Sequence, residues 1–380
     1  MLLPFALLFL AGFYSALLLL YVFGWHRITP FLLPAYFRPS VGIAVIIPAR
    51  NEAGNIGRCI EAILQQQYPP ELVEIIVIDD HSTDNTAAIA AAYPSVKLIQ
   101  LRDYIADKTK LVAYKKKAIE TAIAQTQQEL IVTTDADCFM DAQWLLHIAA
   151  FYQSLDKPPM IAAPVCYARA ASFFDIFQAL DFAGMIIATG ASLQLGLSDM
   201  CNGANLAYRR DVFNQVGGFG GIDTIASGDD MLLMNKIRQH YPKGISFLKN
   251  KAATVYTFPQ PTLNDFVQQR LRWASKSGKY KDKFTTPILA IVYLFNLSII
   301  VVAMCMVVGY GRHLFPYWLL QITLKLAADA VFLYTGTRFF EKKQWLYYFL
   351  PAQLLHILYI VLIGTLGNLK TYYWKGRNVQ

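Results

Sequence analysis

The sequence has few charged residues for its length. Of its 380 residues, 16% are Asp, Glu, Lys or Arg, whereas an ordinary soluble domain has roughly 25%. The mean hydropathy is +0.35, which excludes a wholly soluble or a disordered chain. The five cysteines are odd in number and form no C-x-x-C pair. We therefore expect a reducing compartment, with neither a disulfide framework nor a structural zinc site.

Long apolar stretches accompany this shortage of charge. Three of them lack charged residues and reach the length of about 20 residues that crosses a bilayer: residues 2–23, 287–311 and 345–369. A fourth, 314–334, is interrupted only by Lys325 and Asp329. The pattern predicts three regions, with about three helices in the last: a transmembrane anchor at 1–24, a globular block at 25–286 and a C-terminal membrane region at 287–380.

Basic residues flank the expected membrane segments. Arg27 and Arg38 follow the first one, and four lysines precede the second: Lys276, Lys279, Lys281 and Lys283. Because such residues mark the cytoplasmic side, we expect the block 25–286 in the cytoplasm of a multi-pass protein, in a bacterial inner membrane. The first segment has no basic residue before it, so it is predicted as an uncleaved anchor. No nucleic-acid-binding motif accompanies these charges, and no nucleic acid partner is expected.

The C-terminal topology stays open. If all four apolar stretches cross, the tail with Lys370 and Lys375 lies outside, against the positive-inside rule, while the basic loop 338–343 obeys it. If 314–334 does not cross, because its two charges are costly in lipid, the tail lies inside but the loop does not. We expect four crossing helices. The apolar stretch 173–196 is predicted to be helical without crossing.

An α/β pattern runs through the globular block. Apolar, β-rich runs alternate with segments of helical spacing, which predicts a mostly parallel sheet with right-handed crossovers. The expected strands are 41–47, 73–78, 96–101 and 129–134. The expected helices are 55–66, about 83–92 and 114–124. Since ligands of such sheets bind beyond the carboxyl ends of the strands, the residues that follow these strands are the first candidates for a site.

Two of the four strands end in paired acids, at Asp79-Asp80 and at Asp135-Ala136-Asp137. Asp135 and Asp137 can share a hard divalent cation with phosphate oxygens, which suits Mg²⁺ or Mn²⁺. Neither G-x-G-x-x-G nor G-x-x-x-x-G-K-[ST] occurs at the first strand, so dinucleotide and P-loop binding are not expected. The alternative is that Asp137 and its neighbours merely form a strand-end turn, in which Asp is common.

An ordered series of motifs resembles glycosyltransferase family 2, whose catalytic domain has the GT-A fold. The matching segments are Val45-Ile46-Ile47-Pro48-Ala49-Arg50-Asn51-Glu52, Asp79-Asp80-His81-Ser82-Thr83-Asp84, Lys115 with Ala118, Asp135-Ala136-Asp137, Asn202-Gly203-Ala204-Asn205 with Gly217-Gly218-Phe219, Gly228-Asp229-Asp230 and Gln269-Arg270-Leu271-Arg272-Trp273. The last resembles the Q-x-x-R-W motif of the membrane branch, which includes cellulose, hyaluronan and ceramide-glucoside synthases. Two positions depart from the family pattern: Tyr114 replaces a Gly, and Asp229 replaces a Glu.

The resemblance implies a fold, a reaction and a set of site residues. It implies an α/β GT-A domain beside transmembrane helices, and inverting, metal-dependent transfer from a UDP- or GDP-sugar to a membrane-embedded lipid or lipid-linked acceptor. Asp230 is the implied catalytic base. The implied donor-binding residues are Pro48, Arg50, Asn51, Glu52, Asp80, Lys115 and Asp135, and the implied metal ligands are Asp135 and Asp137. The implied acceptor- or diphosphate-binding residues are Asn205, Asp229, Gln269, Arg270, Arg272 and Trp273.

Other functions remain in view. Among enzymes, the alternative is a processive polysaccharide synthase. From other classes, the alternatives are an inactive scaffold and a transporter or flippase with Lys325 and Asp329 as its charged site; four helices without an internal repeat do not favour the transporter. Arg272-Trp273 beside a membrane segment could also be an interfacial anchor.

Overall fold

The computed structural model describes residues 2–105, 112–197, 200–274, 283–367, 372–374 and 377–379. The chain divides into two compact units, each built from separate parts of the sequence. We call them the helical unit, which comprises Met1–Ile28, Arg169–Ser198 and Pro259–Tyr372, and the α/β unit, which comprises Thr29–Ala168, Asp199–Phe258 and Tyr373–Gln380. This division assigns residues 169–198 and 259–286, which we expected in the globular block, to the helical unit.

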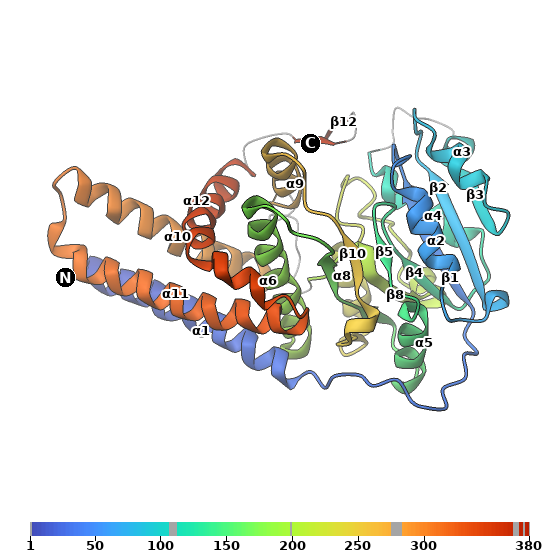
Figure 1. Cartoon of the computed structure of the whole chain (residues 1–380), viewed down its shortest axis with the longest axis horizontal. Helices are drawn as coiled ribbons and strands as arrows, with labels where there is room; N and C mark the ends of the chain where they lie inside the picture. Colours follow the sequence, from blue (N-terminus) through green and yellow to red (C-terminus); the bar gives the residue numbers. More distant parts are fainter. Residues whose placement is uncertain are drawn as a thin grey trace. The chain divides into compact units, whose positions relative to one another are not determined.

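A mixed, mostly parallel sheet forms the centre of the α/β unit, with the order β3-β2-β1-β4-β8-β6-β9 among the described residues (Figure 1). β1, β2, β3 and β4 are mutually parallel, β8 is antiparallel to β4 and β6, and β9 is parallel to β6. Their bounds are β1 Ile43–Ala49, β2 Val73–Asp79, β3 Val96–Gln100, β4 Leu130–Thr133, β6 Met160–Ala162, β8 Leu206–Arg209 and β9 Ile245–Phe247. The first four strands are those that the sequence predicts.

The aliphatic runs form strands because both faces of the sheet are buried. Ile43, Val45 and Ile47 of β1 are fully buried. The helices of this unit are α2 Ile56–Leu64, α3 Thr86–Ala91, α4 Tyr114–Ala124, α5 Trp144–Ser154, α7 Arg210–Gln215 and α8 Met231–His240. Helix α2 buries its predicted apolar face, except that Leu64 is 44% exposed.

Shorter elements complete the α/β unit. β5 Phe139–Met140, β10 Val255–Thr257 and β7 Val165–Tyr167 form a second sheet of three strands. Single turns of 3-10 helix lie at Pro70–Leu72, Leu101–Tyr104, Gly203–Asn205 and Lys251–Ala253. The strands β11 Tyr372–Trp374 and β12 Arg377–Val379 pair with each other near the C-terminus. The second sheet matters for the site because β5 follows directly on Asp135 and Asp137, which we call the D-x-D acids.

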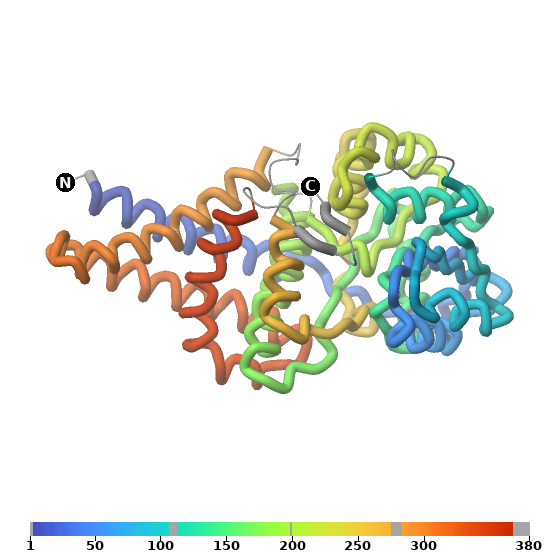
Figure 2. The backbone as a smooth tube through the Cα atoms, turned by 90° about the horizontal axis from the view of Figure 1, so that it is seen from above, coloured from blue at the N-terminus to red at the C-terminus, as the bar shows by residue number. Residues whose placement is uncertain are grey.

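The helical unit contains six α-helices among the described residues: α1 Leu2–Arg27, α6 Phe173–Leu195, α9 Leu263–Ala274, α10 Thr285–Val307, α11 Phe315–Phe339 and α12 Phe349–Leu366. Turns of 3-10 helix at Arg312–Leu314 and Lys343–Tyr348 precede α11 and α12. In Figures 1 and 2, α1 and α11 run alongside each other, and α1 also contacts α6 and α10.

Five of the described helices are long and apolar enough to cross a membrane. Four of them, α1, α10, α11 and α12, occupy the stretches that the sequence predicts. The fifth is α6, of whose apolar window 83% is buried inside the protein, against 22% to 44% for the others. Lys276, Lys279, Lys281, Lys370 and Lys375, which entered the predicted topology, lie outside the described residues. The topology therefore stays a prediction.

Glycines allow α6 to approach its neighbours closely. A Cβ on Gly336 of α11 would lie 3.3 Å from the carbonyl oxygen of Ala183, and one on Gly184 of α6 would lie 3.1 Å from the ring of Phe332. Small residues at helix contacts are typical of packing in membranes, where close van der Waals contact replaces the hydrophobic effect. The α6–α11 contact therefore resembles an interface inside a transmembrane bundle.

Candidate active site

The acids that follow β2 and β4 lie at one edge of the main sheet, as the sequence predicts. β1 separates these two strands and is parallel to both, so the three carboxyl ends point the same way. The backbone N–H of Asp80 donates to the carbonyl of Ala49 at 2.8 Å, which holds the two strand ends together. The edge thus presents Asp79 and Asp80 beside Asp135 and Asp137 from the α/β unit alone.

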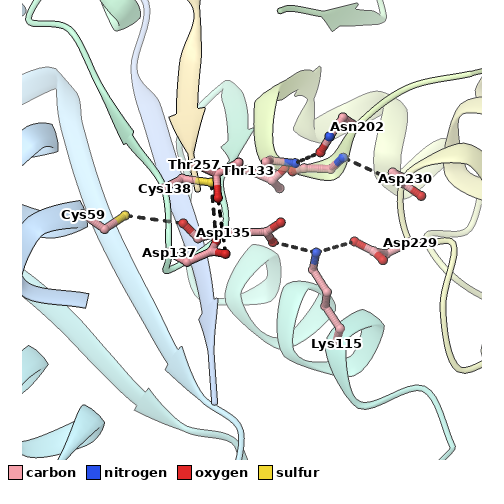
Figure 3. A network of polar contacts seen from close by, with 12 residues as sticks. Cys59, Lys115, Thr133, Asp135, Asp137, Cys138, Asn202, Asp229, Asp230 and Thr257 are labelled. Atoms are coloured by element: carbon pink, nitrogen blue, oxygen red, sulfur yellow. Dashed lines mark hydrogen bonds and ion pairs between the residues drawn. The ribbon is translucent and has the colours of Figure 1, made fainter. Parts of the chain in front are cut away.

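Lys115 connects two groups of acids that are far apart in the sequence. It lies at the start of α4, and Figure 3 shows its Nζ between two carboxylates: 2.8 Å from Oδ1 of Asp135 and 3.2 Å from Oδ2 of Asp229. Burial alone lowers the pKa of Lys115, but attraction by Asp135, Asp229 and Asp230 outweighs it and raises the pKa well above its usual value. The ammonium is therefore charged at any working pH.

Asp230 is held by two backbone N–H groups. It is the N-cap of α8, and its Oδ1 accepts from the N–H of Met231 at 2.7 Å. Its Oδ2 accepts from the N–H of Gly203 at 3.2 Å (Figure 3). Each carboxylate oxygen has a second lone pair, so both contacts orient the group without exhausting its capacity to accept a proton.

Gly203 is required where the two groups of acids meet. A Cβ at this position would lie 3.3 Å from Oδ2 of Asp229, 3.5 Å from Cβ of Asp230 and 3.6 Å from Nζ of Lys115. The preceding Asn202 caps this short turn by accepting from the N–H of Ala204 at 3.0 Å. The backbone at Gly203 therefore packs directly against Lys115 and the Asp229-Asp230 pair.

The surroundings of Asp135 and Asp137 suit a hard cation. Asp137 accepts from the hydroxyl of Thr257 at 3.4 Å and from the thiol of Cys138 at 3.5 Å, both neutral donors. Burial, and then the charges of Asp137 and Asp135, raise the pKa of both Cys59 and Cys138, which reflects a negative field at this point. A cation bound here would be attracted by these negative charges.

The residues present fit a metal that the protein shares with its ligand. No cluster of three or more His, Cys, Asp or Glu side chains that could hold a metal occurs in the part of the chain that the structure describes. Two carboxylates leave coordination positions for phosphate oxygens and water, which is the usual arrangement for Mg²⁺ with nucleotides. Asp135 and Asp137 therefore fit Mg²⁺ or Mn²⁺ bound together with a diphosphate.

The loop after β1 is joined to the loop after β2. Nη1 of Arg50 donates to the backbone carbonyls of Asp80 and His81, at 2.8 and 3.2 Å. Asn51 has a φ of 51°, in the left-handed region that Asn tolerates better than most residues, and its Oδ1 accepts from the N–H of Thr83 at 2.8 Å. These contacts join the two loops that carry the predicted donor-binding residues Arg50, Asn51 and Asp80.

Pro48 and Glu52 are half-buried in the same region, and Asp80 is almost fully buried. Pro48 lies in β1 in register with Ile78 of β2. The backbone N–H of Glu52 donates to the hydroxyl of Thr86 at 2.7 Å. Oδ1 of Asp80 lies 3.0 Å from Nδ1 of His81, so the histidine is a neighbour of this predicted donor-binding acid.

Asn205 is placed differently from the other predicted residues. It is fully buried, its Oδ1 accepts from the indole of Trp144 at 3.0 Å, and its Nδ2 donates to the carbonyls of Pro164 and Ala253, at 2.7 and 2.8 Å. These bonds tie three segments of the α/β unit together. They place Asn205 beneath the site rather than on its surface.

The four residues from the Q-x-x-R-W segment lie on α9, in the helical unit. Gln269, Arg272 and Trp273 are half-buried, whereas Arg270 is only 1% exposed. Arg270 forms an ion pair with Asp181 of α6, with Nη2 and Oδ2 3.0 Å apart. The structure thus brings Lys115, Asp135, Asp229 and Asp230 together in one unit, while this motif belongs to the other.

Two lysines, of which Lys116 is buried and Lys236 is half-buried, support the acceptor-side acids and were not predicted. The ammonium of Lys116 donates to the carbonyls of Ile222 and Ile225, both at 2.7 Å. Lys236 of α8 donates to the carbonyls of Gly218 and Gly220, at 2.6 and 2.8 Å. Both hold the loop that leads to Asp229 and Asp230. The only sign of these contacts in the sequence is the glycine-rich loop itself. Lys116 stands in a basic run, and a lysine in such a run looks like an exposed one.

Comparison with protein families identifies part of the chain. Residues 44–217 match the family profile described as glycosyl transferase family 2. This match covers less than half of the chain, and within it residues 44–217 are similar to a glycosyl transferase family 2 domain. The matched residues include β1, the D-x-D acids and Asn205, whereas Asp229, Asp230 and α9 lie beyond them.

Two curated relatives match shorter parts of this chain. It is 35% identical over 103 residues to "Glycosyltransferase AglE" of Haloferax volcanii, which covers 27% of this chain and 33% of that protein. It is 25% identical over 142 residues to "Beta-monoglucosyldiacylglycerol synthase" of Nostoc sp., which covers 35% of this chain and 29% of that protein. The chain therefore spans a third or less of the length of these two relatives.

A solved structure resembles this chain over most of its length. It is the mannosyltransferase PcManGT from Pyrobaculum calidifontis in complex with GDP-Man and Mn²⁺, with a TM-score of 0.57 and 20% identity, and the match covers 97% of this chain and 99% of that chain. At this identity the likeness shows the fold. The predicted GT-A fold, with helices long enough to span a membrane, is confirmed.

Proposed function

We propose that this protein transfers a sugar from a UDP- or GDP-sugar to a membrane-embedded lipid or lipid-linked acceptor, with inversion at the anomeric carbon and with the help of Mg²⁺ or Mn²⁺. The observation that carries the proposal is the position of Lys115. It links Asp135 of the D-x-D pair to Asp229, next to Asp230. Donor-side and acceptor-side groups of one transfer reaction therefore lie within the reach of one side chain.

Asp135 and Asp137 would hold the cation against the donor diphosphate. When bound, the cation stabilises the negative charge that develops on the departing diphosphate. Lys115 contributes a fixed positive charge at the same place, because its pKa is raised by the neighbouring acids. PcManGT, a fold neighbour, was solved with GDP-Man and Mn²⁺, which supports this pairing of donor and metal. Asp80 and the loop of Arg50 to Glu52 would bind the nucleoside.

Asp230 would act as the general base. As the acceptor hydroxyl attacks the anomeric carbon, its proton passes to a carboxylate oxygen of Asp230, the new C–O bond forms, and the bond to the diphosphate oxygen breaks with its electron pair leaving on the diphosphate. The backbone N–H groups of Met231 and Gly203 hold the carboxylate in one orientation. One base and direct attack need no covalent intermediate on the protein, so the configuration inverts.

A lipid acceptor is favoured by the helical unit and by one relative. In four of its long apolar helices, less than half of the apolar window is buried inside the protein, so an acceptor can arrive from the plane of a bilayer. The Nostoc relative is named for the synthesis of a glucosyldiacylglycerol. Gln269, Arg272 and Trp273 are the residues of α9 that would face diphosphate or acceptor, whereas the buried contacts of Asn205 suit a positioning role. A polysaccharide synthase is the second candidate.

The experiment that tests this function combines a reaction with a lipid analysis. Full-length protein in detergent is given a UDP- or GDP-sugar and Mn²⁺, and release of the nucleoside diphosphate is measured with and without lipid extract. Lipids from cells with and without the gene are then compared by mass spectrometry for a mass difference of one sugar. We expect donor-dependent release and one new glycolipid. A long glycan instead of a glycolipid would favour the polysaccharide synthase.

The matched variant for this test is Asp137→Ala. Removing one of the two predicted ligands should abolish transfer and metal-dependent donor binding, while the thermal unfolding of the protein changes little because Asp137 is only partly buried. Transfer that continues at full rate in excess chelator would contradict the metal assignment.

A further inference from the structure

A chain of buried polar groups runs through the helical unit. On α11, Nζ of Lys325 lies 2.6 Å from Oδ2 of Asp329, and both side chains are almost fully buried. The hydroxyl of Tyr14, from α1, donates to Oδ1 of Asp329 at 2.6 Å. His356 of α12 approaches Lys325, with Nδ1 and Nζ 3.5 Å apart. Three helices thus meet at one buried ion pair.

The chain continues from His356 to the motif-bearing helix. Nε2 of His356 lies 4.0 Å from Oδ1 of Asp181 on α6, and Oδ2 of Asp181 lies 3.0 Å from Nη2 of Arg270 on α9. Two acids therefore face two bases, with a histidine between the pairs. All five elements involved belong to the helical unit, so the chain of contacts lies within one compact body.

Arg270 connects this chain of contacts to Trp273. Its guanidinium carbon lies 4.2 Å from the ring centroid of Trp273 and 4.9 Å from that of Phe266. Trp273 also packs against Phe182, the residue that follows Asp181 on α6, with ring centroids 6.3 Å apart. Two neighbouring residues of α6 therefore contact two residues one turn apart on α9, which fixes the rotation of α9 about its own axis.

Stability does not account for this arrangement. Buried ion pairs are often no more stabilising than apolar side chains of the same volume, and ionisable residues in membrane segments are retained mainly where they serve a function. Orientation does account for it, because the guanidinium of Arg270 is confined between the carboxylate of Asp181 and the rings of Phe266 and Trp273. The group oriented here is the indole of Trp273.

We propose that Asp181 and Arg270 are positioning residues, tied through His356 to Lys325, Asp329 and Tyr14, that hold Trp273 in place for the acceptor. This inference rests on the proposed function, in which Trp273 faces the acceptor or diphosphate. It adds that the specificity of the acceptor step depends on a polar network buried among the long helices. Removing the network should leave reactions of the donor alone unchanged.

The test compares full-length Asp181→Asn with the parent protein in detergent. We expect release of nucleoside diphosphate without acceptor to stay within about 2-fold, and transfer to lipid to fall by about 10- to 100-fold, the loss that a misplacement of about 1 Å can cause. Asp181→Glu, which keeps the charge, should recover most of the transfer. Arg338→Met removes an exposed arginine from the end of α11 and should change neither activity.

A spectroscopic readout separates this inference from the proposed function. The fluorescence of Trp273 is obtained as the difference between each protein and the same protein carrying Trp273→Phe. Asp181→Asn leaves Arg270 present, so a changed Trp273 spectrum reports a changed orientation, even if the protein has no transferase activity. An unchanged spectrum in a folded variant would overturn the inference.

Asp181→Asn can fail to fold, because it leaves Arg270 without its carboxylate. Asp181→Leu with Arg270→Met replaces the pair by apolar side chains of similar size, which buried pairs often tolerate. This double variant should fold, release nucleoside diphosphate at the parent rate and transfer to lipid about 10- to 100-fold more slowly. Transfer at the parent rate, or an equal fall of both activities, would overturn the inference.

Discussion

The two units of this protein use charge in opposite ways. In the α/β unit, Asp230 caps a helix, accepts from two backbone N–H groups and keeps part of its surface exposed. In the helical unit, Lys325, Asp329 and Arg270 are almost fully buried and contact other side chains. The first arrangement leaves groups available to a ligand, and the second fixes helices to one another.

This difference has an energetic consequence. A carboxylate held by backbone N–H groups can lose its charge without leaving a buried partner uncompensated. A buried lysine cannot be removed alone, because its carboxylate then stays in a medium of low dielectric. Replacing Asp230 should therefore change the rate more than the stability, and removing Lys325 alone should do the reverse.

The largest expected effect is that of Asp230→Asn. The amide has nearly the same size, but its one oxygen can accept from only one of the N–H groups of Gly203 and Met231, and it cannot take a proton at neutral pH. General-base catalysis contributes about 10²- to 10⁴-fold, so transfer should fall by that factor. Donor affinity should stay nearly unchanged, and loss of one hydrogen bond should cost about 1 kcal/mol of stability. Steady-state kinetics and donor titration measure both quantities.

Asp229→Asn is the control for that prediction. Asp229 contacts Lys115 rather than the N-terminus of α8, so its amide should reduce transfer clearly less. If Asp229→Asn abolishes transfer and Asp230→Asn spares it, the base is Asp229. If Asp230→Asn mainly weakens donor binding, Asp230 belongs to the donor site.

The second prediction concerns stability in the helical unit. Lys325→Met leaves Asp329 buried with the hydroxyl of Tyr14, and loss of one partner of a buried pair costs about 3–5 kcal/mol. Lys325→Met with Asp329→Leu should be within about 1 kcal/mol of the parent, because both charges are gone. Unfolding of the three proteins in one detergent gives the comparison. Equal stability of the single and double variants would show that the two units do not differ in this way.

Much of the α/β unit could be predicted from the sequence because its signals are local. Strands that are buried on both faces are continuous aliphatic runs, and the acids that follow them must lie at the same edge of a parallel sheet. Asp80, Asp135 and Asp137 were found by this reasoning alone. Asp229 and Asp230 needed the resemblance to a family, since no strand or periodicity pointed to them.

The remaining features depend on contacts between distant segments. Nothing local distinguishes Lys116, which is 1% exposed, from Lys117, which is partly exposed, because the difference lies in the loop that folds over one of them. Arg270 was predicted to bind diphosphate, and its ion pair with Asp181, 89 positions earlier in the numbering, follows only from the packing of α9 on α6. Helical periodicity gives a face but not the partner of that face.

A third prediction uses the tight packing at Gly203. Gly203→Ala places a methyl group 3.3 Å from Oδ2 of Asp229 and in van der Waals contact with Nζ of Lys115, at 3.6 Å, so the carboxylate of Asp229 must shift by a few tenths of an ångström. We expect transfer to fall by about 10-fold with only a small change in the thermal midpoint. The control is Gly54→Ala, where a Cβ meets no atom within 4 Å. Equal kinetics of the two variants would contradict the importance of this contact.

The smallest expected effect distinguishes two neighbouring lysines of α4. Lys117 pairs with Glu120 one turn away, at 3.1 Å, and both side chains are about 40% exposed, so Lys117→Met should change the free energy of unfolding by less than about 0.5 kcal/mol. Lys116→Met, of the same chemical change, leaves the buried carbonyls of Ile222 and Ile225 without their donor and should cost about 1–3 kcal/mol. Denaturant unfolding of both variants measures the difference. If Lys117→Met is as costly as Lys116→Met, exposure does not govern the contribution of a charge in this unit, and the contrast with the helical network would have to rest on something other than burial.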